Sequence, residues 1–112
     1  MNEITWQEFD QVELRVGTII VVEDFPEARK SAYKLTVDFG DKIGIKKSSA
    51  QITHHYSKKQ LLGKQVIAVV NFPDKQVGPF MSQCLITGFY DENGDVILAV
   101  PDKNLENGKK LG

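Results

Sequence analysis

The sequence predicts a small all-β barrel, and three observations support this fold class. Several segments alternate apolar with polar residues, the pattern of strands that bury one face. These segments are short and separated by turn residues, and Asn93-Gly94 between two of them is a strong hairpin signal. The longest segment, residues 12–24, has Gly17 near its middle, where a glycine often marks a bulge or bend that lets a strand curl around a barrel.

The chain has 112 residues, which predicts one domain, residues 1–112, with a hydrophobic core of its own. Its 41% hydrophobic and 26% charged residues are ordinary for a globular protein. The single cysteine, Cys84, excludes an internal disulfide and a cysteine-rich zinc site. Because its neighbours Leu85 and Ile86 are apolar, we expect a buried, unreactive thiol.

Neither a membrane span nor a targeting signal is visible in the sequence. No apolar run approaches the ~18 residues of a membrane helix. The amino-terminal segment MNEITWQEFD is acidic and lacks the basic start and apolar centre of a signal peptide. The expectation is a cytoplasmic protein without membrane insertion.

The net charge of −1 conceals a division of charge along the chain. Residues 1–28 carry seven acidic side chains and one basic side chain, whereas residues 29–82 carry ten basic and three acidic ones. A chain with a positive middle can present a basic face to an anionic partner. Lysines spread around a barrel merely to keep it in solution would give the same count, so charge alone leaves both interpretations open.

The first expected element is a short helix. Thr5 and Glu8 fit a capping box, and about two helical turns are expected after Thr5. Trp6 and Phe9 are spaced to share one face of this helix. Two large aromatic side chains need a surface to cover, which is either one end of the barrel or a subunit interface.

Three strands forming a meander are expected next. Residues 12–24 alternate, and the residues expected on one face are Leu14, Val16, Thr18, Ile20 and Val22. Residues 33–39 are the clearest half-buried strand, with Tyr33, Leu35, Val37 and Phe39 on the apolar face. Gly40-Asp41 then turns the chain into a third strand over residues 42–49, in which Ile43 and Ile45 alternate with polar positions.

A helix and the central strand follow. Ser57 is placed to cap a short helix that ends at Gly63. Residues 65–70 have the β-branched, apolar composition of a core strand, which Phe72-Pro73 ends because proline lacks the N–H that a sheet requires. We expect a loop from there to Ser82. Two further strands, in residues 83–90 and 96–100, flank the Asn93-Gly94 turn, and Pro101 ends the second of them.

Five to six strands with short flanking helices and a curling first strand fit an OB-type Greek-key barrel. Such barrels commonly bind oligonucleotides or other extended polymers on their second and third strands and the loops beside them. Here those strands carry Lys34, Lys46 and Lys47. The loop after the central strand adds an amide, a lysine and a hydroxyl in Asn71, Lys75 and Ser82, which is binding chemistry rather than catalytic chemistry.

The same loop is unusually apolar for a solvent-exposed segment. A hydrophobic groove for an unfolded polypeptide could be built from Phe25, Phe72, Pro73, Val77, Pro79, Phe80 and Met81. Alternatively, Phe72 and Phe80 could cap the barrel core. Both interpretations remain open at this point.

Catalytic and metal chemistry are not expected. His54-His55 invites a metal interpretation, but adjacent residues of a strand or helix point apart, and no cysteine or carboxylate follows at ligand spacing. Ser48-Ser49 has no paired base, and no glycine-rich phosphate loop occurs. The sequence therefore predicts a protein that is not an enzyme, with no metal ligands and no cofactor.

Several segments together resemble the tRNA-binding domain family. They are Leu14-Arg15-Val16-Gly17-Thr18-Ile19, Tyr33-Lys34-Leu35, Asp38-Phe39-Gly40, Leu61-Leu62-Gly63-Lys64-Gln65-Val66 and Val70-Asn71-Phe72. Three segments resemble the CsaA branch of that family: Phe25-Pro26-Glu27-Ala28-Arg29, residues 44–53 and Val69-Val70-Asn71-Phe72-Pro73. The resemblance spans nearly the whole chain.

The resemblance implies a homodimeric OB-fold protein that acts as an export-related chaperone. Its expected partners are unfolded or secretory preproteins and the export ATPase, and the wider family implies tRNA, recognised by structure, as the alternative ligand. The nucleic-acid contacts it implies are Arg15, Lys34, Lys46, Lys47, Asn71, Lys75, Ser82 and Gln83. The expected peptide-binding residues are Phe25, Phe72, Val77, Phe80 and Met81, and the expected dimer interface contains Trp6, Phe9 and Pro101.

Overall fold

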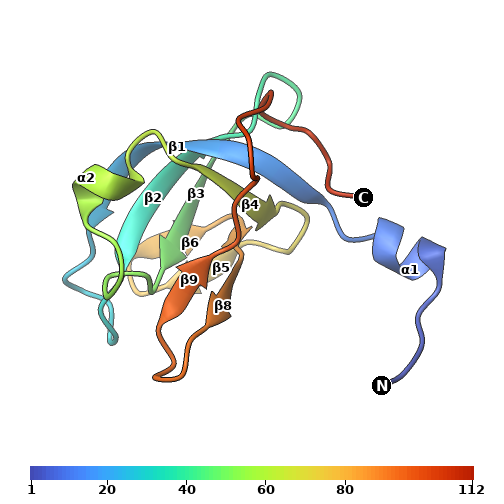
Figure 1. Ribbon diagram of the computed structural model, residues 1–112. Coiled ribbons are helices and arrows are strands. Elements are labelled where there is room, and N and C mark those ends of the chain that lie inside the picture. The colour runs from blue at the N-terminus through green and yellow to red at the C-terminus, as the bar shows by residue number, and fades with distance from the viewer.

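A computed structural model describes residues 1–112 as a curled antiparallel sheet with two small hairpins and two short helices (Figure 1). In chain order the elements are α1 (Trp6–Asp10), β1 (Leu14–Asp24), β2 (Tyr33–Asp38), β3 (Ile45–Ala50), α2 (Lys58–Leu61), β4 (Gln65–Val69), β5 (Lys75–Val77), β6 (Phe80–Ser82), β7 (Leu85–Ile86), β8 (Gly88–Tyr90) and β9 (Val96–Leu98). No helix of the chain is long and apolar enough to cross a membrane.

The main sheet has the strand order β3-β2-β1-β4-β7, and all of its pairs are antiparallel. Its two ends approach each other where Lys47 of β3 and Gln83 exchange hydrogen bonds, from the Gln83 N–H to the Lys47 carbonyl at 2.7 Å and from the Lys47 N–H to the Gln83 side-chain oxygen at 3.0 Å. The result is the expected OB-type barrel. The total of nine strands exceeds the predicted five to six because the expected loop after β4 forms β5 and β6, and the strand expected over residues 83–90 is divided into β7 and β8.

The first strand bends as expected, but its bulge lies beyond the glycine. The pairing of β1 with β2 shifts register between Ile19 and Val21, so Ile19 is fully buried and Ile20 is 39% exposed. The single alternating face predicted for residues 12–24 is therefore interrupted at the bulge, beyond which Val22 packs against the same core as Ile19. Gly17 serves close packing instead, since a Cβ there would lie 2.7 Å from the ring of Phe39.

The core lies inside the curled sheet and beneath α2. Alternation in β2 is confirmed, with Leu35 and Val37 almost completely buried. The third strand begins at Ile45 rather than at residue 42, because residues 40–44 form a turn in which Gly40 and Gly44 both have positive φ. Ile45 is consequently 59% exposed, and the buried positions of β3 are Ser48 and Ala50.

Both predicted helix starts are confirmed, because Thr5 with Glu8 and Ser57 with Gln60 form complete capping boxes. Helix α1 is only five residues long and buries none of them. It projects from the barrel (Figure 1), and Trp6 is 85% exposed. The alternative in which Trp6 and Phe9 cover one end of the barrel is therefore wrong.

Two segments differ from the expected loops. The chain after β4 folds into the β5–β6 hairpin rather than an irregular loop, with Gly78 at φ 56° in its turn. The carboxy-terminal tail runs along β1, where the Val16 N–H donates to the carbonyl of Lys109 and the Leu111 N–H donates to the carbonyl of Leu14. The Asn93-Gly94 hairpin is present as predicted, as β8–β9.

Candidate ligand-binding surface on β3 and the β5–β6 hairpin

The β5–β6 hairpin is attached to the outer side of β3. The Ser49 N–H donates to the Ser82 hydroxyl at 3.3 Å, beside the paired Lys47 and Gln83. The buried Ser48 hydroxyl donates to the carbonyl of Cys84 at 3.0 Å. Ser82 and Gln83, two of the predicted nucleic-acid contacts, therefore hold the hairpin against the barrel.

A cavity of about 490 Å³ lies between β3 and this hairpin, and we refer to it as the hairpin cavity. Its walls combine apolar side chains with hydroxyl, amide and ammonium groups. The lining residues are Ser49, Gln51, Phe72, Pro73, Lys75, Gln76, Val77, Ser82, Cys84 and Leu85. An open cavity of this size, with apolar walls and a few polar groups, is typical of a ligand-binding site.

Two of the predicted peptide-binding residues, Phe72 and Phe25, differ sharply in exposure. Phe72 is 54% exposed and lines the hairpin cavity, so it does not cap the barrel core. Phe25 is only 4% exposed and packs edge-on against Phe80, with ring centroids 5.5 Å apart. Phe72 is thus presented to a ligand, whereas Phe25 supports the tip of the hairpin from beneath.

Val77 and Met81 lie on the hairpin itself. Val77 is half-buried and lines the hairpin cavity, and Met81 is 43% exposed. In the strand register Val77 is paired with Phe80, and Met81 with Gln76. The hairpin therefore presents apolar side chains at its turn as well as in the cavity.

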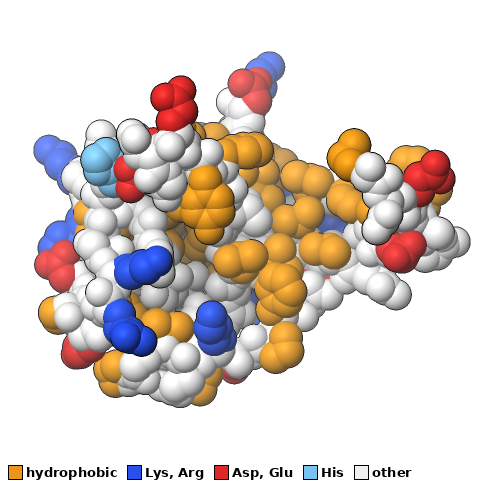
Figure 2. Space-filling model, turned by 90° about the horizontal axis from the view of Figure 1, so that it is seen from below, with side chains coloured by type: hydrophobic (Ala, Val, Ile, Leu, Met, Phe, Trp, Pro, Cys, Tyr) orange, Lys and Arg blue, Asp and Glu red, His pale blue; other side chains and the backbone are white.

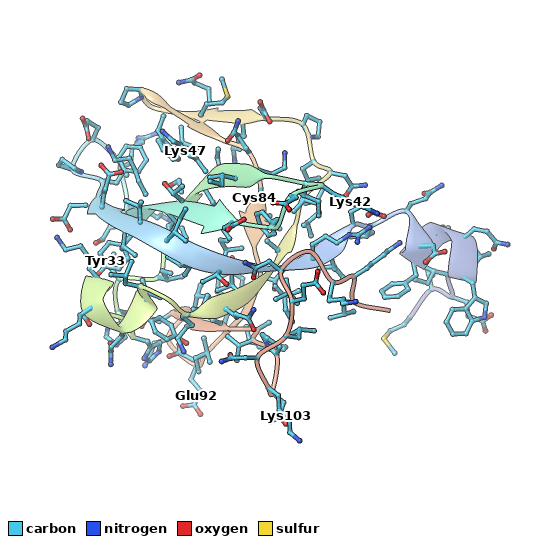
Figure 3. All side chains as sticks on the ribbon, turned by 90° about the horizontal axis from the view of Figure 1, so that it is seen from above. Tyr33, Lys42, Lys47, Cys84, Glu92 and Lys103 are labelled. Carbon is cyan, nitrogen blue, oxygen red and sulfur yellow. The ribbon has the colours of Figure 1, made fainter.

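Predicted cations gather beside the cavity on the outer face of β2 and β3. Lys34 is paired with Ser49, and Thr36 with the exposed Lys47, so these side chains share one face of the sheet. Figure 3 shows Lys47 on the side of β3 that faces the hairpin. The Lys34 ammonium lies 5.6 Å from the centroid of the Phe25 ring, a cation–π contact that holds it near the hairpin tip.

The side chains of Lys46 and Lys47, both predicted nucleic-acid contacts, lie on opposite faces of the sheet. Lys46 is opposite the buried Val37 in the register, so its side chain points to the inner side of the sheet. The two lysines are adjacent in the strand and therefore point in opposite directions. Only Lys47 lies with Lys34 on the outer face.

Two further predicted contacts are already engaged within the chain. The Arg15 guanidinium forms an ion pair with Glu13 and donates to the carbonyl of Gly108 at 2.9 Å. The Asn71 side-chain amide accepts from the Glu13 N–H at 3.0 Å and donates to the carbonyl of Gln11 at 2.7 Å. Both side chains fasten the chain termini to the barrel and lie outside the hairpin cavity.

Electrostatics around Glu13 strengthen that attachment. Hydrogen bonds from Arg15 and then from Lys110 hold the pKa of the Glu13 carboxyl below its usual value. The hydrogen bond to Glu13 raises the pKa of Lys110. At neutral pH both groups are charged and join the tail to the start of β1.

The predicted interface residues do not lie together in one chain. Trp6 and Phe9 are on the projecting helix α1, whereas Pro101 lines a small cavity beside Leu62 and Gly63 at the end of α2. Figures 1 and 3 both place α1 and α2 on opposite sides of the barrel. A single dimer interface that contained both α1 and Pro101 would have to extend across the barrel.

Sequence reasoning missed Ser49 and Gln51, which line the hairpin cavity. A signal for them existed, because Lys47, Ser49 and Gln51 follow the period of two along β3 and so share its outer face. The expected environment of Cys84 is confirmed. Burial raises the pKa of this thiol to about 11.

His54 and His55 have no carboxylate at ligand spacing in the sequence, yet these two histidines lie beside carboxylates in the fold. They lie in a turn rather than in a strand or helix, and their ring centroids are 4.8 Å apart. Asp91 and Asp95 of the β8–β9 turn lie against them, at 2.7 Å from His55 and 3.6 Å from His54. The histidines and aspartates come from segments far apart in the sequence, so the spacing of residues along the chain does not reveal that they meet.

Fold and site together describe an OB-type barrel with a cavity beside its third strand. Over residues 14–110 the sequence matches the family described as "Putative tRNA binding domain". The chain belongs to this tRNA-binding domain family, as its sequence predicts.

Solved structures of two CsaA chaperones are very similar to this chain. The protein from Picrophilus torridus is 49% identical, with a TM-score of 0.91, and the match covers 98% of this chain and 100% of that one. The protein from Bacillus anthracis is 44% identical, with a TM-score of 0.92, covering 99% of this chain and 100% of that one. The resemblance to the CsaA branch is therefore confirmed.

The chain is also similar to part of larger enzymes. It is 31% identical over 111 residues to the methionine–tRNA ligase of Methanocaldococcus jannaschii and 32% identical over 111 residues to that of Pyrococcus furiosus. These matches cover 99% of this chain but only 17% and 15% of the two ligases. The similarity thus concerns one domain of each ligase.

Proposed function

We propose that this chain is a non-catalytic, CsaA-like binding protein for unfolded or secretory polypeptides, and that it also carries a tRNA-binding-type surface. The observation that supports the polypeptide ligand most directly is the hairpin cavity. Phe72 is exposed at its wall, and Val77 and Leu85 extend the apolar lining. An unfolded segment offers apolar side chains and free backbone groups, which this mixture of walls can accommodate.

The second candidate, tRNA, is supported by the outer lysines and by membership of the family. Lys34, Lys47 and Lys75 lie on neighbouring strands around the cavity. Ammonium groups so placed can neutralise phosphates along a nucleic-acid backbone, and the hydroxyl of Ser49 can add contacts to the sugars. The two ligands would occupy adjoining parts of one surface.

The experiment that separates these ligands is a fluorescence-anisotropy titration of the full chain with a labelled unfolded preprotein segment and with labelled total tRNA. Each titration is run at about 50 and about 200 mM salt, a range over which phosphate binding weakens by orders of magnitude. Polypeptide binding that changes little with salt supports the proposal. A chain that binds neither ligand overturns it.

Matched variants test whether each ligand binds at the hairpin cavity and the lysines beside it. Phe72→Ala is expected to weaken polypeptide binding by about 2 kcal/mol, because it removes an exposed aromatic from the cavity wall. Phe89→Ala is its control, since Phe89 is 68% exposed on the other hairpin. For tRNA, the double substitution Lys47→Ala and Lys75→Ala should reduce the salt dependence of the binding affinity. Lys103→Ala is the control and should leave it unchanged, because the Lys103 side chain projects away from the barrel in Figure 3.

A homodimer is part of the proposal. Helix α1 presents Trp6 in solvent, and exposed apolar side chains lie between it and the barrel in Figure 2. A contiguous apolar surface of this kind on a small protein favours association. Light scattering at micromolar concentration is expected to give twice the 12.6 kDa of one chain, and Trp6→Ala should reduce that mass. A mass of 12.6 kDa for the unmodified chain contradicts a dimer.

A further inference from the structure

The turn after β3 and the turn of the β8–β9 hairpin bring two imidazoles and two carboxylates together. We propose that His54, His55 and Asp95 bind a divalent transition-metal ion of the Zn²⁺ class, with Asp91 orienting one of the ligands. The ligand atoms of His54, His55 and Asp95 all lie within 4.8 Å of one another. This site is separate from the hairpin cavity and does not rest on the function proposed above.

Distances in the cluster suit a metal ion after small side-chain rotations. The His54 Nε2 lies 3.6 Å from the Asp95 carboxylate, close to the separation of two ligands on one zinc ion, which is ~3.3 Å for bonds of ~2.0 Å in a tetrahedron. The two imidazole rings are 4.8 Å apart, with an interplanar angle of 83°. They are therefore not stacked, and rotation about their side-chain bonds can aim one nitrogen of each ring at a common point.

Asp91 fixes the ring of His55. One carboxylate oxygen of Asp91 accepts from the N–H groups of Asn93 and Asp95, both at 2.9 Å, so this carboxylate is held by its own turn. Its other oxygen lies 2.7 Å from the His55 Nε2. With the Nε2 proton donated to Asp91, the Nδ1 lone pair of a neutral ring is free for a metal, and such carboxylate–histidine pairs are the usual support of metal-binding imidazoles.

The chemistry and exposure of these groups indicate the kind of ion. Two imidazole nitrogens and one carboxylate suit zinc and its neighbours rather than calcium or magnesium, which prefer oxygen ligands. The His54 side chain is 64% exposed and that of Asp95 33% exposed, so an ion can enter and keep water at a fourth position. Figure 2 shows histidine at the surface next to acidic side chains.

Binding would have a structural consequence. His54 and His55 belong to the segment between β3 and α2, whereas Asp95 immediately precedes β9. An ion shared by these segments joins the β8–β9 hairpin to the barrel. It would add to two side-chain contacts already present there, the His55–Asp91 contact and the hydrogen bond from the Leu98 N–H to the Tyr56 hydroxyl at 3.0 Å.

The test is a calorimetric titration of the tag-free full chain with zinc chloride in a buffer that does not bind metals. One ion per chain is expected. His54→Ala and Asp95→Asn should each weaken binding at least about tenfold, the effect typical of losing a group at a metal site. The control is Glu92→Gln, which removes one negative charge from the same turn, and Glu92 points away from the barrel in Figure 3. This variant should bind zinc like the unmodified chain.

A second measurement uses the unmodified chain and so does not depend on the folding of any variant. In a two-dimensional NMR titration, zinc should first shift the signals of His54, His55 and Asp95. No saturable binding up to about 1 mM zinc, a concentration that corresponds to only weak affinity, would overturn the proposal. So would first shifts elsewhere in the chain, or equal binding by His54→Ala, Asp95→Asn and the unmodified protein.

Discussion

The hairpins β5–β6 and β8–β9 have strands of the same length but are attached to the barrel in different ways. The first is held by neutral hydrogen bonds to the edge of β3, from Ser48 and between Lys47 and Gln83. The second is joined to β4 at its base, where Thr87 and Ala99 form backbone hydrogen bonds with Ile67. The Tyr56 hydroxyl and the contact of His55 with Asp91 hold the rest of it. The first hairpin thus lies along the edge of β3, whereas the turn of the second rests against an ionisable side chain of a loop.

This difference suits the two hairpins to different roles. The hydrogen bonds that join β5–β6 to β3 involve no titratable side chain, so the position of the cavity walls does not depend on pH. The contact at the turn of β8–β9 is made by titratable groups, which respond to protons. The β5–β6 hairpin therefore suits a ligand site of fixed shape, and the turn of β8–β9 suits a contact whose strength changes with pH.

The largest expected effect concerns the thiol of Cys84, beneath the β5–β6 attachment. Burial raises its pKa to about 11, against 9.0 for a free thiol, so at pH 8 the reactive thiolate should be about 100-fold scarcer than in the unfolded chain. Reaction with a disulfide reagent should be slower in the native protein by at least that factor. Similar rates in native and denatured protein would show that the β5–β6 hairpin separates freely from β3. The two hairpins would then not differ as described.

Two substitutions measure how much each attachment contributes to stability. Ser48→Ala removes a buried hydroxyl that donates to the Cys84 carbonyl, and we expect it to lower the free energy of unfolding by about 2 kcal/mol. Tyr56→Phe removes the acceptor of the Leu98 N–H at a half-buried position, and the expected loss is about 1 kcal/mol. Urea unfolding measures both. A larger loss for Tyr56→Phe would reverse the ranking of the two attachments.

The smallest expected effect is a difference in acid sensitivity. The hydrogen bond with His55, followed by those from the turn backbone, lowers the pKa of the Asp91 carboxyl from its model-peptide value of 3.8. Stabilisation by Asp91 is therefore complete above that value and is lost as the pH falls below it. Amide exchange of Tyr90 and Val96 should accelerate as the pH falls below about 4, relative to that of Val77 and Phe80.

Asp91→Asn is the control for this acid effect. Its side chain keeps an oxygen for the turn but has no carboxylate to titrate. The difference in acid sensitivity between the two hairpins should disappear in this variant. If β5–β6 loses protection at the same pH as β8–β9 in the unmodified chain, the two attachments do not differ as described.

Much of the fold is predictable from local sequence. Alternation in residues 33–39, the two capping boxes and the Asn93-Gly94 turn are each encoded within a few neighbouring residues, and the structure confirms all of them. The face predicted to be shared by alternate residues of the first strand does not continue past Thr18. A one-residue bulge shifts every later side chain to the other face, and no local pattern announces it.

The site was predicted in part. Phe72, Val77, Lys75 and Ser82 do line one cavity, because they lie on the segment that the sequence singles out. Arg15 and Asn71 were assigned to a ligand, yet their partners belong to the chain itself. The Arg15 partner Gly108 lies 93 residues away, and the Asn71 partner Glu13 lies 58 residues away.

The sequence by itself therefore determined the strand periods, the caps, the turns and the family of this protein, because each depends on residues near one another along the chain. The tertiary structure alone decided which cations share a face, which polar side chains remain free for a ligand, and that two histidines lie against two aspartates. These depend on strand register and on contacts between distant segments. Such contacts depend on the closed barrel, because only the folded chain brings these distant segments side by side.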